Sequence, residues 1–289
     1  MFRRLHASSF APLASFVAVL AVSLLALGLG RPALAGSWEN LDEVIQKRGA
    51  IAIGIGYSTP PMNYLDDQGQ HAGFDVDLAK ALAERMHLRY TVVKVNNKTR
   101  ITSLSGGETD MVLSNMNRTM SRARQIDFSD TYLLDGKRIL APKGQYRELK
   151  DFVGKRIAVC QGSNAQQAVA EALKALGDPS PRIMSFQTDS ECFLALKAGK
   201  VDGYTNDTVI LAGVSGNDPA FEVVGEVYSP TYYGIGLPQN QSAWRYRVNA
   251  ALRSLVMDGT YQRIYDAWFG PKGRYPLPPA SGKLPVWAD

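Results

Sequence analysis

The alternation of hydrophobic and polar positions predicts two successive sets of short strands and amphipathic helices. Apolar, β-branched runs of about five residues, typical of buried strands, are followed by segments in which apolar side chains recur every three or four positions. Leu78, Leu82 and Met86 share one face of one such predicted helix, whereas Lys80 and Glu84 lie elsewhere on it. These segments are therefore predicted to be helices that cover a sheet with their apolar face.

The series of strand, helix and strand favours parallel sheets with crossover helices, so two such series predict two α/β lobes. The predicted strands are 51–55, 91–95, 110–114, 156–160, 182–186 and 201–204. The predicted helices lie near 75–86, 99–105, 164–176, 190–198 and 241–257.

The second lobe is predicted to be inserted into the first. After it ends, the apolar segment GIGLP and the helix near 241–257 return to the first lobe, which gives boundaries of 36–133 with 234–289 for lobe 1 and 137–228 for lobe 2. The two connections lie at 132–136 and 229–233, and two connecting strands make a hinge.

The first 35 residues have the pattern of a secretory signal peptide. Arg3 and Arg4 precede an apolar run at 10–30, and the small residues Ala33 and Ala35 occupy the positions that signal peptidase requires. Cleavage near Ala35 would make this an exported, periplasmic protein. A retained membrane anchor is the alternative, because the apolar run approaches the length that spans a bilayer.

Once the predicted signal peptide is removed, the composition of the remaining chain argues against nucleic acid as a partner. The remaining 254 residues hold 29 basic and 27 acidic side chains, so the net charge falls from +5 to +2. No basic patch interleaved with aromatic residues remains, and nucleic acid is therefore not an expected partner. The length suits one large or two medium domains.

Cysteine and histidine usage gives no metal-ligand pattern. Export would permit a disulfide between Cys160 and Cys192, the only cysteines, with two separate buried thiols as the alternative. His6, His71 and His87 are scattered, so neither a metal nor a cofactor is expected.

Several motifs, in their order and spacing over 38–272, resemble the periplasmic solute-binding proteins of polar amino-acid ABC transporters. They are LDEVIQKRGAIAIGI, TPPMNYLDDQGQHAGFDVDLAKALAERM, the arginine loop ending in IDFSDTY, GKRIAVCQGSNA, KAGKVDGYTND and DGTYQRIYDAWFG. The resemblance implies a type II periplasmic binding fold that captures an amino acid, as a monomer and without covalent chemistry, and delivers it to a membrane permease. The stretch NKTRITSLSGGETD is most similar to the glutamate/aspartate binders.

The resemblance implies that Arg122 and Asp207 grip the two charged groups of a zwitterion from opposite lobes. The arginine would form a bidentate pair with the α-carboxylate, a geometry that guanidinium supplies. Asp207 would receive the ammonium. The alternatives are an arginine solvated on a helix surface and an aspartate that caps the helix starting at Thr208.

Four further residues would surround the α-carboxylate and ammonium. Asn115 and Asn117 stand where the family usually has a small residue and a threonine or serine, and a plain turn role is their alternative. Ser163 and Asn164 follow a predicted strand and open a helix, where free N–H groups bind anions. Capping that helix is compatible with this role.

The residues that would set side-chain specificity give conflicting signals. Arg100 matches the arginine that approaches the side-chain carboxylate in glutamate/aspartate binders, which favours an acidic ligand. Gly56 and Asp189, however, replace an arginine and a histidine of those binders, and Arg100 paired with Asp189 is the alternative. Tyr57 either stacks on the ligand or packs beneath its loop. The ligand stays open among glutamate, aspartate, glutamine and other small polar amino acids.

Two rival functions come from other classes. Cyclohexadienyl dehydratases look similar over the whole length, and Asp189 or Glu191 would be the general acid of such an enzyme. The sensor module of a membrane receptor would need a C-terminal transmembrane segment that the sequence does not contain. Prephenate turnover separates the enzyme from the binding protein.

Overall fold

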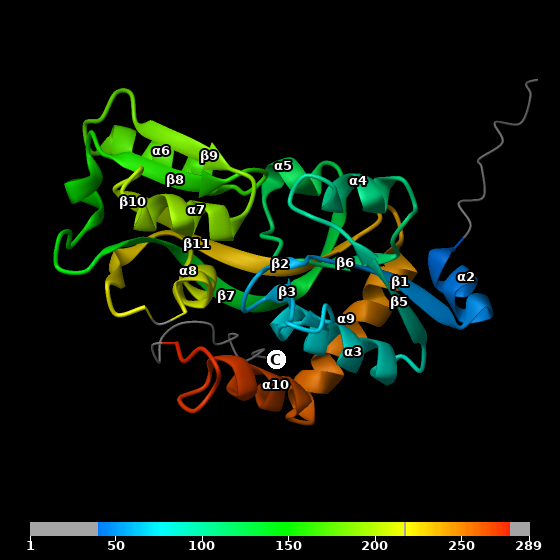
Figure 1. The fold of residues 1–289 in the computed structure, drawn as a ribbon. Helices are drawn as coiled ribbons and strands as arrows, with labels where there is room; N and C mark the ends of the chain where they lie inside the picture. Colours follow the sequence, from blue (N-terminus) through cyan, green and yellow to red (C-terminus); the bar gives the residue numbers. More distant parts are fainter. Residues whose placement is uncertain (1–39, 217, 278–289) are drawn as a thin grey trace, which may run out of the picture. The chain divides into compact units, whose positions relative to one another are not determined.

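The computed structural model describes residues 40–216 and 218–277 (Figure 1). The predicted signal peptide and the last residues, 278–289, lie outside these ranges. The helices are α2 Leu41–Arg48, α3 Phe74–Arg85, α4 Arg100–Ser105, α5 Met120–Ala123, the 3-10 helix Leu149–Phe152, α6 Ala165–Ala175, α7 Asp189–Lys197, α8 Thr208–Ser215, α9 Ser242–Met257 and α10 Thr260–Phe269. The strands are β1 Ala50–Ile55, β2 Ser58–Thr59, β3 Asn63–Leu65, β4 His71–Ala72, β5 Arg89–Lys94, β6 Met111–Leu113, β7 Asp127–Pro142, β8 Arg156–Cys160, β9 Arg182–Phe186, β10 Gly203–Asp207 and β11 Phe221–Leu237.

One eight-stranded sheet runs through both predicted lobes in the order β5-β1-β6-β11-β7-β10-β8-β9, and β2, β3 and β4 form a small separate sheet. β5, β1 and β6 are parallel, as are β10, β8 and β9, which confirms the predicted crossover units at both ends. β11 and β7 lie in the middle and are antiparallel to each other and to their outer neighbours. The sheet is therefore continuous and mixed, not two separate parallel sheets.

The two connections between the lobes are much longer strands than the sequence predicted. β7 and β11 pair along most of their length, with a register shift between Val224 and Ser229. Glycines, a proline and charged residues interrupt the hydrophobic alternation of both segments, so the period-2 pattern was hidden. Tertiary pairing, not local pattern, makes them strands.

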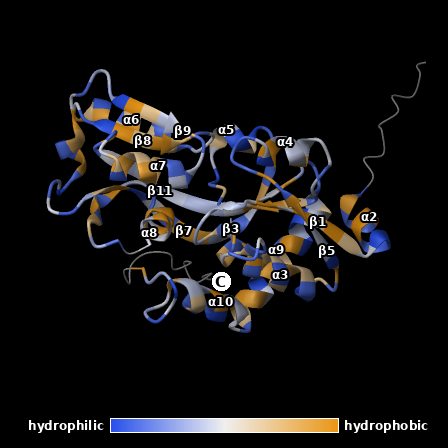
Figure 2. Ribbon diagram, in the orientation of Figure 1, coloured by the Kyte–Doolittle hydropathy of each residue, from blue (hydrophilic) through white to orange (hydrophobic). Residues whose placement is uncertain are grey.

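Separate clusters of buried side chains lie along the sheet. In lobe 1, Met111 and Leu113 pack in one cluster with side chains of α3 and α9, whereas Val112 packs in another cluster with Leu104 of α4. Figure 1 shows α3 and α9 on one side of the sheet and α4 on the other. In lobe 2, Ala158 packs with α7 and Val159 with α6. Strands buried on both faces read as continuous apolar runs, and β1 is hydrophobic along most of its length (Figure 2).

Both cysteines are free, buried thiols, so the disulfide alternative is wrong for this structure. Burial raises the pKa of Cys160 and of Cys192. Within 40–216 and 218–277, no cluster of His, Cys, Asp and Glu could hold a metal ion. Over the same ranges, no helix is both long and apolar enough to cross a bilayer.

Candidate functional site

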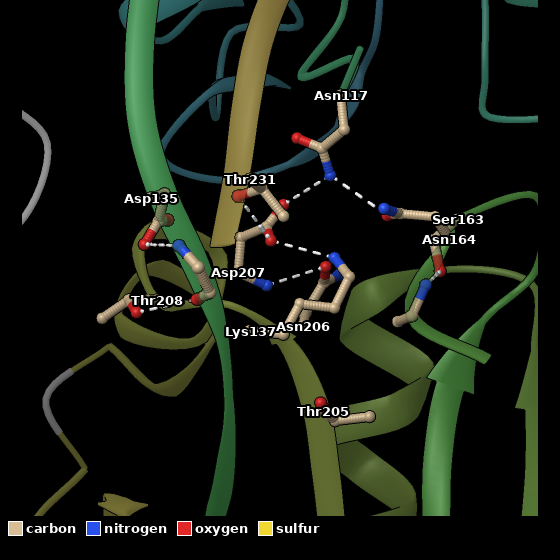
Figure 3. Close-up of polar contacts among 12 residues, drawn as sticks. Asn117, Asp135, Lys137, Ser163, Asn164, Thr205, Asn206, Asp207, Thr208 and Thr231 are labelled. Atoms are coloured by element: carbon tan, nitrogen blue, oxygen red, sulfur yellow. Dashed lines mark hydrogen bonds and ion pairs between the residues drawn. The ribbon is translucent and has the colours of Figure 1, made fainter. Parts of the chain in front are cut away.

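The polar residues of the candidate site lie where β7 and β11 pass from one lobe to the other. The segment after β6, the segment after β8 and the end of β10 meet here, at the carboxyl ends of the parallel strands. Ligands of open α/β sheets bind at this edge. Figure 3 shows Asn117, Asn164 and Asp207 pointing toward one another.

Arg122 lies in the four-residue helix α5, whose first turn is capped by the Thr119 side chain. It is 8% exposed, which rules out the solvated-surface alternative. Its Nη1 donates to the Asn117 carbonyl at 2.9 Å and its Nη2 to the Gly162 carbonyl at 3.2 Å. Burial lowers the pKa of Arg122, and the carboxylate of Asp207 opposes that shift. The guanidinium has five N–H groups, so donors remain for a carboxylate.

Asp207 is 1% exposed and is surrounded by hydrogen-bond donors (Figure 3). Its Oδ1 accepts from Lys137 Nζ at 2.9 Å and Thr231 Oγ1 at 3.1 Å. Its Oδ2 accepts from Tyr233 Oη at 2.6 Å and Asn117 Nδ2 at 3.0 Å. Burial alone would raise the pKa of this carboxyl, but the ion pair with Lys137 and the hydrogen bonds outweigh it, and the pKa is lowered.

The helix-capping alternative for Asp207 is wrong. Asp207 precedes α8, yet its side chain makes no capping bond. Instead, the N–H of Val209 donates to Asp135 Oδ2 at 2.8 Å. Desolvation and the nearby charge of Asp207 raise the pKa of Asp135 to about 7.

The two asparagines before α5 differ in role. Asn117 spans the lobes, because its Nδ2 donates both to Asp207 and to Asn164 Oδ1 at 3.1 Å. Its buried Oδ1 has no partner within the described residues. Asn115 has a left-handed φ of 40° and accepts from Asn63 Nδ2 at 3.2 Å, so the turn alternative describes its backbone.

Ser163 and Asn164 open α6 without a regular cap. Ser163 Oγ donates to the Cys160 carbonyl at 2.7 Å and accepts from the N–H of Ala165 at 3.3 Å, which makes it the local turn residue. Asn164 has no capping bond and faces Asn117. Gly162 has φ +74°, and a Cβ there would lie 2.9 Å from the carbonyl of Asn97.

Arg100 and Asp189 do not pair. Arg100 is 2% exposed, and its Nη1 donates to the Ser114 carbonyl at 2.6 Å. Its Nε is buried without a partner within the described residues. Burial and the charge of Arg122 lower the pKa of Arg100 to about 9. The predicted alternative of an Arg100–Asp189 bridge is therefore wrong.

Asp189, at the start of α7, is compensated by neutral donors alone. Its Oδ1 accepts from Tyr204 Oη at 2.6 Å and Asn206 Nδ2 at 2.7 Å, and its Oδ2 accepts from Thr59 Oγ1 at 2.9 Å. Burial raises the pKa of this carboxyl, and the hydrogen bonds only partly offset the shift. Glu191 points elsewhere and accepts from the N–H of Gln187.

A small cavity of about 20 Å³ lies beside Asp189. Its lining residues include Gly56, Tyr57, Thr59, Asn63, Asn97, Asn115, Cys160, Gln187 and Asp189. Among these described residues Asp189 supplies the only carboxylate, and none is Lys or Arg. Tyr57 is 38% exposed at the rim. A Cβ at Gly56 would lie 1.9 Å from Asn63 Oδ1, so an arginine does not fit at position 56 without rearrangement.

The sequence interpretation missed the buried cation Lys137 and its neighbours Asp135, Thr231 and Tyr233. Lys137 is fully buried in β7, opposite Asp207 in β10. A charged residue between apolar runs in a connecting segment was the one available signal. The structure thus brings Arg122, Asn117, Asn164 and Asp207 together, with Asp189 at the neighbouring cavity; their ligand-binding roles stay predictions.

Comparison with known proteins gives consistent matches. The profile of the family described as "Bacterial extracellular solute-binding proteins, family 3" matches residues 51–271. The ABC transporter glutamine-binding protein GlnH of Bacillus subtilis (strain 168) is 29% identical over 266 residues, which cover 90% of this chain and 96% of that protein. ABC transporter arginine-binding protein 1 of Escherichia coli (strain K12) is 31% identical over 225 residues, or 76% and 90% of the two chains. The solved structure of an ancestral arginine-binding protein bound to arginine has a TM-score of 0.72 and 33% identity, over 77% of this chain and 99% of that one.

Proposed function

Because the chain belongs to the bacterial extracellular solute-binding proteins, family 3, we propose that it captures one polar α-amino acid outside the cytoplasm and delivers it to the permease of an ABC transporter. Its fold is the type II periplasmic binding fold, with two α/β lobes and a two-strand connection, which confirms the predicted class. The predicted lobe boundaries, the cleaved signal peptide and a monomeric state form part of this proposal.

The observation that carries the proposal is the buried guanidinium of Arg122 between the two lobes. It contacts one carbonyl from each side, Asn117 and Gly162, and keeps free donors. A guanidinium that is already desolvated and oriented loses little further freedom when it binds a carboxylate. We therefore expect Arg122 to hold the α-carboxylate of the ligand.

The side chain of the ligand is proposed to carry an amide or a guanidinium. The cavity beside Asp189, which must widen from about 20 Å³ to admit a ligand side chain, presents one carboxylate and several amide or hydroxyl groups. A ligand carboxylate there would face Asp189 without a cation among the lining residues, which is unfavourable in a desolvated site. The names of the glutamine- and arginine-binding relatives agree with this choice. The glutamate/aspartate preference expected from the resemblance is therefore not retained in the proposal.

Closure of the lobes about 132–136 and 229–233 is the proposed mechanism. A ligand bound by residues of both lobes favours the closed arrangement, because it makes more contacts there. Small-angle scattering should show a smaller radius of gyration with saturating ligand. An unchanged radius would contradict closure.

The test is a thermal-shift panel of the twenty amino acids, followed by calorimetric titration of the best ligand. Arg122→Ala should abolish measurable binding, because a charge-assisted bidentate pair contributes roughly 1.5–3 kcal/mol and a buried ligand carboxylate without a partner costs more. Arg124→Ala is the matched control, since Arg124 is exposed at the end of the same helix. Stabilisation by none of the twenty would overturn the amino-acid ligand, and an affinity of the Arg122 variant within threefold of wild type would overturn its role.

A further inference from the structure

The carboxylate predicted to receive a ligand ammonium already holds an ammonium from the protein itself. Lys137 is fully buried, and its Nζ lies 2.9 Å from Asp207 Oδ1 (Figure 3). The two residues are register partners across the antiparallel pair β7 and β10, which places their side chains on the same face of the sheet. The pair is therefore built into the sheet.

Asp207 also has no acceptor position left. A carboxylate offers about four lone-pair sites, and four donors fill them: Lys137, Thr231, Tyr233 and Asn117. A ligand ammonium that binds Asp207 must displace one of these donors and approach the ammonium of Lys137. Two like charges in a desolvated site repel each other.

One acceptor beside this pair is unoccupied. The Oδ1 of Asn117 is buried without a partner within the described residues, and the orientation of the amide is fixed because Asp207 can only accept from its Nδ2. An ammonium carries three N–H donors and a positive charge. A hydroxyl carries one donor and no charge, so this single neutral acceptor suits a hydroxyl better.

We propose that Lys137 acts as an internal substitute for the ligand ammonium, and that the site binds 2-hydroxy carboxylates with an affinity within tenfold of that for α-amino acids with the same side chain. The inference rests on the proposed function, in that Arg122 holds the carboxylate in both cases. The 2-hydroxyl donates to Asn117 Oδ1, and Lys137 keeps Asp207 neutralised. Lys137 thereby determines specificity at the α-position of the ligand.

The experiment compares matched pairs of probes on the wild-type protein by calorimetry. The pairs are L-arginine with its 2-hydroxy analogue (argininic acid), and L-glutamine with its 2-hydroxy analogue (4-carbamoyl-2-hydroxybutanoic acid). We expect the 2-hydroxy member of the pair that binds to have a Kd no more than tenfold above that of the amino acid. An amino-acid preference greater than tenfold overturns the inference and leaves the proposed function intact. Binding of the hydroxy acid alone supports the inference and overturns the amino-acid ligand, and binding of neither member by any pair overturns both.

Variants at position 137 test the role of the lysine. Lys137→Met frees Asp207 for a ligand ammonium, so the ratio of affinities should shift toward the amino acid by at least tenfold, whereas Lys137→Arg should preserve the wild-type ratio. Lys150→Met removes the lysine of an exposed ion pair with Glu148 and serves as the control. An unchanged ratio in Lys137→Met overturns the specificity role. If Lys137→Met does not fold, the double variant Lys137→Met/Asp207→Asn, which removes both charges, is measured instead. Its ratio of affinities for the two probes should stay within tenfold, as in the wild type. A preference above tenfold for the amino acid in that variant overturns the inference.

Discussion

The two ends of the candidate site are built around buried carboxylates that are compensated in opposite ways. Asp207 has a lysine and three neutral donors, and its pKa is lowered despite burial. Asp189 has neutral donors only, and burial raises its pKa. A charge that the protein has already paired gives a ligand little to gain, whereas a charge without a cation is stabilised by a cationic ligand. The Asp189 end is thus suited to distinguish ligands by the charge of their side chain. At the Asp207 end, the charge is neutralised by the protein whichever ligand binds.

Breaking the internal ion pair should produce the largest effect. Lys137→Met leaves Asp207 buried without its cation, and the loss of one partner from a buried pair costs about 3–5 kcal/mol of unfolding free energy. Urea denaturation of this variant and of the exposed control Lys150→Met should give a much lower midpoint for the first alone. Coincident midpoints would mean that the buried pair contributes nothing to stability.

Neutralising the other carboxylate should change selectivity more than stability. Asp189→Asn removes a buried charge that has no cationic partner, so the free energy of unfolding should stay within about 1 kcal/mol of wild type. The affinity for L-arginine should fall at least tenfold and that for L-glutamine less than threefold, since only the guanidinium loses an ion pair, whereas the neutral amide of glutamine can still donate to the asparagine Oδ1.

Calorimetry with both amino acids measures this difference. Glu191→Gln, on the same helix but directed at the N–H of Gln187, is the matched control. Equal losses for the two ligands would remove Asp189 from charge discrimination.

A smaller effect is expected where Gly162 of lobe 2 lies close to Asn97 of lobe 1. Gly162 has φ +74° and lies against the backbone of Asn97, whereas Gly154 has φ +72° and nothing within 4 Å of its missing Cβ. Alanine at either position should cost roughly 1–2 kcal/mol of stability for the left-handed backbone. Only Gly162→Ala should also weaken ligand binding, by about threefold to tenfold, because the new Cβ obstructs closure. Equal affinities in the two variants would argue against that obstruction.

A further effect is expected in the pH dependence of stability at the Asp207 end. The pKa of Asp135, raised from 3.8 to about 7, means that the folded protein keeps a proton between pH 4 and 7 that the unfolded chain releases. The free energy of unfolding therefore falls as the pH rises through that window. The titratable groups that face Asp135 are Asp207, Tyr233 and Tyr265.

Asp135→Asn should flatten this dependence, measured as Tm from pH 4.5 to 7.5. A residual fall is expected because the pKa of Asp75 is raised to about 6 by burial. The slope is compared and not the absolute Tm, since asparagine keeps only one of the oxygens that accept from Gly136 and Val209. Identical slopes would show that Asp135 does not titrate in this window.

Much of the fold was predictable because its elements carry local signals. The strands at 51–55, 156–160 and 182–186 and the helix at 241–257 agree with the observed elements within a residue or so. Period and apolar runs determine these segments independently of their neighbours. The long strands β7 and β11 gave no such signal, since they depend on pairing with each other.

In the candidate site, too, some features were predictable from the sequence and others depended on tertiary contacts. The motif order around Arg122 and Asp207 placed them at strand ends and loop starts, and the structure brings them close enough for Asp207 to influence the pKa of Arg122. The roles of Arg100 and Asp189 could not be separated by sequence, because the two readings differ only in where the side chains point. The structure has them bonded to different partners.

The sequence by itself thus determined the class of fold and most of its elements, because these depend on local pattern or on a motif, whereas the ligand-binding roles of Arg122 and Asp207 stay predictions. Only the tertiary structure decided which charges are compensated. Lys137 and Asp207 are 70 positions apart, and they pair because β7 and β10 align in one register. Burial and electrostatic pairing depend on distances in space, which the separation of two residues along the chain does not fix. Those distances decide whether a buried charge is already neutralised by the protein or is left for a ligand.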